Sequence, residues 1–131
     1  GIWKSAPGES STYSRHANIL AVVSGLTTDG TIVETDLVAV GTPYMKTFEC
    51  LALVSLGAKQ EGVDALRTYW ARMTENGATT YWEACRERDT EETIPEFYGR
   101  PYGRSLCHAW SSGPSFMLPE MILGIRPLSA G

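Results

Sequence analysis

The stretch from Gln60 to Asn76, QEGVDALRTYWARMTEN, decides the fold class because its apolar residues recur every three or four positions. Charged residues fill the opposite side, and Asn76-Gly77 supplies a stop signal. The apolar stripe consists of Val63, Leu66, Tyr69, Trp70 and Met73. This pattern predicts an amphipathic helix that packs one face into a core.

Two helices are expected before this one, at 14–26 and 43–56, and both are apolar on more than one face. Thr42 is a suitable N-cap for the second, and Pro43 fits its first helical position. Gly57 is a plausible residue to end it.

A fourth helical segment is expected from Leu106 to Leu123, with an interruption at 111–114, where Pro114 either restarts a helix or kinks one. Strand signals are limited to short β-branched patches at 31–33 and 38–40. We therefore predict an all-α chain in which residues 1–131 form a single helical segment.

Helices that are apolar on two faces need neighbours on both sides, and a small bundle normally shows one stripe per helix. Four helices in 131 residues supply few such neighbours. The sequence therefore suggests that partner helices are missing from this chain. A compact four-helix bundle with a rich core explains the pattern about equally well.

Composition excludes several classes of protein. The net charge is −4 and the 11 Lys and Arg residues are scattered, which argues against a nucleic-acid binder. No apolar run reaches the roughly 18 residues of a membrane span. Cys50, Cys85 and Cys107 are odd in number and widely spaced, so we expect reduced thiols, at least two of them buried, with neither a disulfide framework nor a metal site or cofactor.

The first residues, Gly1 to Lys4, include neither an initiator Met nor a signal-peptide core. We therefore expect the chain to begin inside a longer protein or after processing. Both the cytoplasm and the periplasm remain open as compartments.

The segment Gly77 to Glu83, GATTYWE, is a candidate sugar site. Aromatic side chains such as Tyr81 and Trp82 can pack on the apolar face of a pyranose, and a carboxylate such as Glu83 takes part in acetal hydrolysis. By composition alone the commoner case is that both aromatics lie in the core and Glu83 is a surface charge.

The segment Ser105 to Pro114, SLCHAWSSGP, is the second candidate. His108 is suited to donate a hydrogen bond to a substrate hydroxyl, and Trp110 lies close by in the sequence. A buried histidine bonded to a backbone carbonyl explains His108 equally well. The charged run 86–92 alternates in sign and is expected to be a solvated loop.

Together, segments 77–83 and 105–114 resemble the end of the catalytic domain of bacterial α-L-rhamnosidases. Residues 13–18, YSRHAN, and residues 118–127, which include ILGIRP, are also similar to that family. The resemblance covers nearly the whole chain, from about Tyr13 to Pro127, and the four motifs occur in the family's order.

This resemblance implies a partial (α/α)6 toroid, with about four helices of a twelve-helix ring, so that the chain is the C-terminal third of a glycoside hydrolase catalytic domain. It implies an inverting reaction in which Glu83 is the general base and His108 contacts rhamnose, with Tyr81, Trp82 and Trp110 as further substrate contacts. The family's general acid lies upstream and has no counterpart here.

Without that acid, the isolated chain is expected to be inactive. Its expected partners are a rhamnose-containing carbohydrate and the remaining helices of the parent domain. Two alternatives stay open: another six-hairpin carbohydrate-active enzyme, and a non-catalytic helical scaffold.

Overall fold

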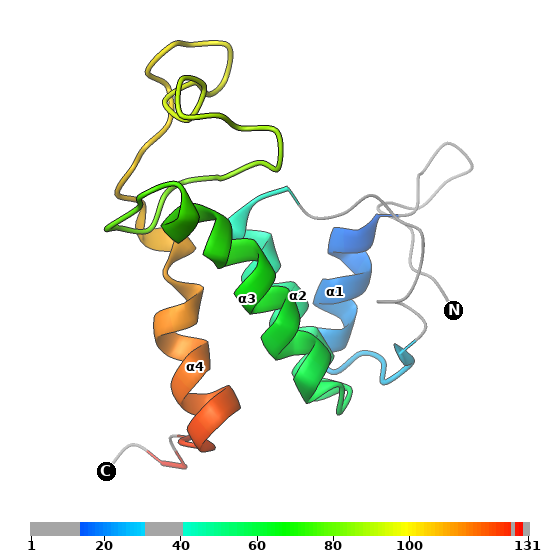
Figure 1. Ribbon diagram of the computed structural model, residues 1–131. Helices are drawn as coiled ribbons and strands as arrows, with labels where there is room; N and C mark the ends of the chain where they lie inside the picture. The colour runs from blue at the N-terminus through cyan, green and yellow to red at the C-terminus, as the bar shows by residue number, and fades with distance from the viewer. Residues whose placement is uncertain (1–13, 31–40, 127, 130–131) are drawn as a thin grey trace, which may run out of the picture.

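The computed structural model describes residues 14–30, 41–126 and 128–129 (Figure 1). Within these ranges the protein is helical and contains no β-strand, which confirms the predicted all-α class for this part of the chain. The elements are α1 (Arg15–Val23), α2 (Pro43–Ser55), α3 (Lys59–Glu75), the 3-10 helix η2 (Ala109–Ser111) and α4 (Gly113–Leu123). The two predicted β-branched patches, 31–33 and 38–40, lie outside the described residues.

The local signals of α2 act as the sequence predicts. The Thr42 side chain accepts a hydrogen bond from the backbone N of Met45 at 3.4 Å, and Pro43 occupies the first helical position. Gly57 follows the helix with a φ of +84°, a left-handed conformation that glycine adopts without a steric penalty. Because only three residues separate α2 from α3, the two helices form an antiparallel hairpin.

The expected helix from Leu106 to Leu123 is wrong in its first third. Residues 106–108 are irregular, residues 109–111 form η2, and the α-helix begins only at Gly113. Pro114 lies in the first turn of α4, where its missing N–H costs no helical hydrogen bond. The backbone before η2 pairs instead with residues 80–83, as described below.

The core forms around α2, which contacts α1, α3 and α4. The stripe predicted on α3 is buried there, packed with residues of α2, α4 and the loop after α3. Two close contacts tie the elements together: the Trp70 indole N–H donates to the carbonyl of Ser111 at 2.9 Å, and Gly62 lies so near Met121 and Val54 that a Cβ would crowd both. The helices therefore form a packed base.

A long irregular loop, residues 77–108, extends beyond one end of this base (Figure 1). It leaves the C-terminal end of α3 and returns to the N-terminal side of α4 through η2. Both ends of the loop are thus anchored on buried helices. The two motifs singled out in the sequence lie at these two ends, so the helices hold them near each other.

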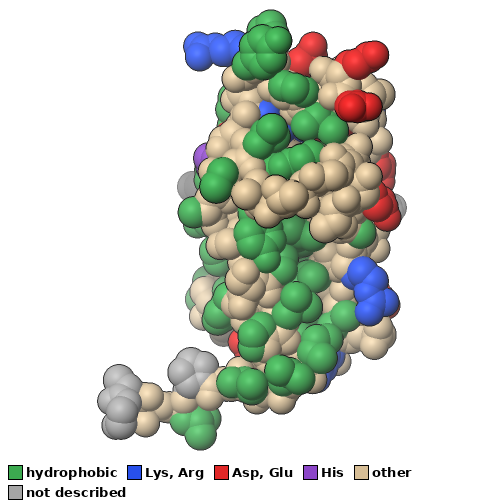
Figure 2. Space-filling view, turned by 60° about the vertical axis from the view of Figure 1, so that its left-hand side comes forward, with side chains coloured by type: hydrophobic (Ala, Val, Ile, Leu, Met, Phe, Trp, Pro, Cys, Tyr) green, Lys and Arg blue, Asp and Glu red, His purple; other side chains and the backbone are tan. Residues whose placement is uncertain are grey.

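Exposed hydrophobic side chains concentrate on α4 and the residues after it. Figure 2 shows them on the face to which α4 contributes. They are Phe116, Leu118, Ile122, Leu123, Ile125 and Leu128. The sequence suggested uncovered surface on the helices at 14–26 and 43–56; in the described residues the larger set falls on α4 instead. None of the described helices combines the length and the hydropathy needed to cross a bilayer.

Candidate functional site

The two motif segments lie side by side and run antiparallel. The backbone N of Glu83 donates to the carbonyl of Ser105 at 2.8 Å, and the backbone N of His108 donates to the carbonyl of Tyr81 at 2.8 Å. The Thr80 hydroxyl also donates to the carbonyl of Leu106. Residues far apart in the sequence are therefore joined at the base of the loop.

Glu83 is buried, with 6% of its surface exposed. Its Oε2 accepts a hydrogen bond from the backbone N of Ser105 at 3.0 Å, and its Oε1 accepts one from the Tyr98 hydroxyl at 3.2 Å. Both donors are neutral. No ion pair in the described part of the chain involves Glu83.

Two other carboxylates with buried side chains are held differently. Glu49 pairs with Arg15 at 2.5 Å and with Lys46, and Asp89 pairs with Arg104 at 2.6 Å and Arg86 at 2.8 Å. Burying a carboxylate is costly unless hydrogen bonds or counter-charges compensate for the lost water. Glu83 is therefore oriented by its partners without being neutralised by a cation, which is the arrangement expected of a reactive carboxylate.

The second motif also presents an aromatic surface, which begins at His108, the residue whose backbone N donates to the carbonyl of Tyr81. The His108 and Trp110 rings lie 4.4 Å apart between centroids, and Trp110 lies 5.8 Å from Tyr44 at the start of α2. Trp110 and Tyr44 are both substantially exposed, so their faces are accessible to a ligand. Such surfaces suit the C–H face of a sugar. That Glu83 and His108 contact the same sugar ring stays a prediction.

The neighbours of Glu83 in its own segment take separate environments. Tyr81 is half-buried, and its hydroxyl lies 2.9 Å from that of Ser115 on α4. It lines an open apolar groove of about 690 Å³ between α3 and α4. Trp82 is 6% exposed and belongs to the core cluster. The structure therefore offers no support for Trp82 as a substrate contact.

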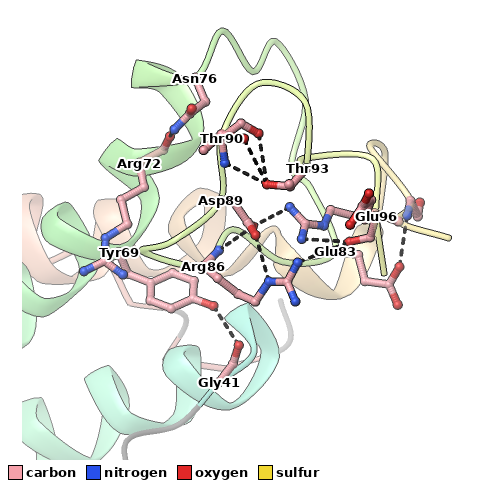
Figure 3. Close-up of polar contacts among 12 residues, drawn as sticks. Gly41, Tyr69, Arg72, Asn76, Glu83, Arg86, Asp89, Thr90, Thr93 and Glu96 are labelled. Carbon is pink, nitrogen blue, oxygen red and sulfur yellow. Dashed lines mark hydrogen bonds and ion pairs between the residues drawn. The ribbon is translucent and has the colours of Figure 1, made fainter. Parts of the chain in front are cut away.

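The expectation of a solvated loop at 86–92 is wrong for one residue. Glu87 and Arg88 are exposed, but only 1% of the Asp89 side chain is accessible, and the side chain of its partner Arg104 is completely buried. Figure 3 shows the contact of Asp89 with Arg86. Burial alone would raise the pKa of Asp89, but hydrogen bonds from Arg104 and Arg86 outweigh it and lower that pKa. The loop is thus built on a buried ion cluster.

Two partners of Glu83, Tyr98 and the backbone N of Ser105, were not identified from the sequence. The donor at Ser105 is a backbone N–H, which nearly every residue has, so the sequence alone could not identify it. Tyr98 directly precedes Gly99 in the stretch FYGR, and glycine is typical of a turn. An aromatic residue in such a turn is the signal that could have pointed to Tyr98, which the structure shows to be exposed.

The cysteines follow the prediction: Cys50 and Cys85 are buried, and Cys107 is exposed. All three are free thiols. Burial raises the pKa of the Cys50 thiol to about 12, so this group behaves as a small hydrophobe in the core.

The sequence matches no protein-family model and no curated protein. The resemblance to α-L-rhamnosidases therefore stays a prediction that rests on the quoted motifs. The geometry around Glu83 is an independent observation on which a function can be argued.

Proposed function

We propose that this chain is the C-terminal third of an (α/α)6 catalytic domain in a glycoside hydrolase that resembles the inverting α-L-rhamnosidases. In this proposal Glu83 is the general base. The observation that carries it is the environment of Glu83: among the described residues this buried carboxylate accepts hydrogen bonds from two neutral donors and from no cation, and one donor belongs to the segment that carries His108 and Trp110.

An inverting hydrolase needs a carboxylate that activates water on the face of the sugar opposite the leaving group. Glu83 would accept a proton from this water as the water oxygen bonds to the anomeric carbon. The bond from that carbon to the leaving oxygen breaks at the same time, and a general acid protonates the leaving oxygen. Ser105 N and Tyr98 OH each engage one carboxylate oxygen, so further lone pairs remain for the water.

The acid has to lie about 6.5–9.5 Å from the base to leave room for the water. In the described residues the other two buried carboxylates, Glu49 and Asp89, are committed to cations, which makes them poor proton donors. The proposal therefore assigns the acid to another part of the parent domain, and the isolated chain would be inactive.

Substrate binding would fall to the aromatic surface of the second motif. His108 would hydrogen-bond a sugar hydroxyl, and Trp110 would contact the apolar face of the ring, with Tyr44 beside it. The substrate class proposed is a rhamnose-containing glycan or glycoside. The chemistry needs neither a metal nor a cofactor, because both proton transfers use carboxyl groups.

Helices outside this chain would complete the ring. The α2–α3 hairpin is the kind of unit from which such a ring is built, and the exposed apolar residues of α4 lie beside the groove between α3 and α4. A contiguous apolar face of this kind is typical of an interface. We propose that the remaining helices of the parent domain cover it.

The test is the Glu83→Gln variant of the full-length protein, assayed with an aryl α-L-rhamnoside. Turnover is expected to fall about 10²- to 10⁴-fold, the usual contribution of a general base. Rhamnose binding, measured by calorimetry, is expected to change little because Gln keeps the shape of the side chain. The matched control is Glu87→Gln, at a side chain that is 81% exposed.

A Glu83→Gln variant that keeps the wild-type rate would show that Glu83 is not the base. If the wild-type protein hydrolyses other glycosides and no rhamnoside, the substrate class is wrong. If it hydrolyses none, the chain is a scaffold without activity.

A further inference from the structure

Tyr98 lies in an unusual place for a tyrosine. Residues 97–100 form a two-residue hairpin turn: the backbone N of Arg100 donates to the carbonyl of Phe97 at 2.9 Å, and the reverse bond measures 3.1 Å. The central residues have positive φ angles, 52° at Tyr98 and 70° at Gly99. Positive φ at both positions is the pattern of a type I′ turn, whose first central residue is preferably Asn, Asp or Gly.

Packing explains this choice of residue only in part: the Tyr98 ring lies 4.2 Å from the Phe97 ring between centroids. Among the described residues Tyr98 is the one non-glycine residue with a positive φ, a conformation that is strained for a bulky side chain. Its side chain is 71% exposed, so little burial compensates for the strain. Strained residues of this kind cluster at functional sites. What distinguishes the side chain is its hydroxyl, which reaches Oε1 of Glu83.

Two arginines, Arg104 and Arg86, hold the residues that precede the turn. Arg104 donates to the carbonyl of Glu96 at 3.1 Å and lies 5.4 Å from the centre of the Phe97 ring. Arg86 contacts the same carbonyl at 3.4 Å (Figure 3). A Cβ at Gly103 would lie 2.2 Å from the Phe97 carbonyl oxygen, so the returning chain passes close to the turn. The buried pair of Arg104 and Asp89, together with the partly exposed Arg86, therefore fixes the base of the turn.

We propose that Tyr98 is a positioning residue, which holds the Glu83 carboxylate in the orientation that receives the proton of the attacking water. This inference rests on the proposed function. Ser105 N fixes one carboxylate oxygen and Tyr98 fixes the other, so the plane of the carboxylate is defined from two sides. The 3.2 Å distance is at the long end, as hydrogen bonds to catalytic groups often are before substrate binds.

The phenol remains a donor throughout the pH range of the reaction. Loss of solvation and the hydrogen bond to Glu83 raise the pKa of Tyr98 above its ordinary value. A tyrosine that already ionises only near pH 10 in water thus stays protonated at neutral pH. Tyr98 transfers no proton in this role.

The test uses Tyr98→Phe and Tyr98→Asn in the full-length protein, with Glu83→Gln measured alongside. Both Tyr98 variants should lower kcat by about 10- to 100-fold, the effect of losing one hydrogen bond to a charged group. KM should stay within about threefold, because the contact acts on the base rather than on bound substrate.

Tyr98→Asn separates this role from a structural one. Asn is favoured in the first position of the turn, so this variant should be at least as stable as the wild type while still losing activity. The control is Tyr102→Phe, which removes a hydroxyl from a residue that is 89% exposed in the same loop. It should leave kcat and KM unchanged.

The outcomes distinguish the two proposals. If Glu83→Gln is inactive while both Tyr98 variants keep the wild-type kcat, the positioning role is overturned and the general base stands. If Glu83→Gln keeps its rate, the proposed function is overturned and the role of Tyr98 falls with it.

Discussion

Removing the Asp89 carboxylate should loosen the loop that carries Tyr98 and Ser105. Asp89 accepts three hydrogen bonds: from the backbone N of Arg86 at 2.8 Å, from Arg86 Nε at 2.8 Å and from Arg104 Nη1 at 2.6 Å. The Asp89→Ala variant leaves the fully buried Arg104 without its carboxylate. Removing one partner of a buried ion pair costs about 3–5 kcal/mol.

Cys85 provides a local measurement of this loss. Its side chain is 2% exposed in the core next to the loop, so a thiol reagent reaches it only when the region opens. Each 1.4 kcal/mol corresponds to about tenfold in an opening equilibrium. Labelling of Cys85, followed by peptide mass spectrometry, should therefore become about 100-fold to several thousand-fold faster in Asp89→Ala. An acceleration below about tenfold would refute the view that this ion pair stabilises the loop.

Glu87→Ala is the matched control, two residues away in the same loop. Glu87 also pairs with an arginine, Arg72, but its side chain is 81% exposed. An exposed pair contributes about 0–1 kcal/mol, so labelling of Cys85 should accelerate by less than about fivefold. The contrast between the two variants isolates the effect of burial from that of charge.

The same contact has a pH dependence with a defined sign. The pKa of Asp89 is lower in the folded protein than its ordinary value, because the hydrogen bonds from Arg104 and Arg86 outweigh the effect of burial. Its contribution to stability is therefore complete above the ordinary pKa of about 3.9 and is lost as the pH falls through the lower folded pKa. Asp89→Ala should lack this acid-dependent step.

Two further predictions concern the core and α4. In the native protein iodoacetamide should modify Cys107 and spare Cys50, because Cys107 is exposed whereas burial raises the pKa of Cys50 to about 12; comparable labelling of both would contradict the core packing. Ile122→Asp should destabilise the full-length protein by about 2 kcal/mol or more in urea unfolding, because other helices are proposed to cover this exposed residue of α4; unchanged stability would place that face in solvent.

Signals close together in the sequence predicted the helices well. The ends of α2 were predicted correctly because capping depends on neighbouring residues, here Thr42, Pro43 and Gly57. The spacing of apolar residues likewise predicted the buried face of α3. The segment from Leu106 to Trp110 was mispredicted because the backbone at 105–108 hydrogen-bonds to residues 80–83 across the loop. Such pairing overrides local helix preference and leaves no pattern in the sequence.

The candidate site was predictable in part. Its two motifs could be placed together through their resemblance to a family, but the arrangement of their side chains could not. Tyr81 lines the groove and Trp82 enters the core, and which of the two is buried depends on what packs against the segment. Burial of Asp89 with Arg104, and the reach of Tyr98 to Glu83, join residues 15 positions apart through an irregular loop that has no periodicity.

Chemical rescue tests most directly whether Glu83 faces the anomeric carbon. In the full-length Glu83→Ala variant, azide can occupy the space left by the side chain and attack the sugar without a base. With an activated aryl α-L-rhamnoside, we expect azide to restore release of the phenol and to yield the β-rhamnosyl azide, because attack comes from the face opposite the leaving group. Absence of rescue, or formation of the α-azide, would contradict the assignment of Glu83 as the inverting base.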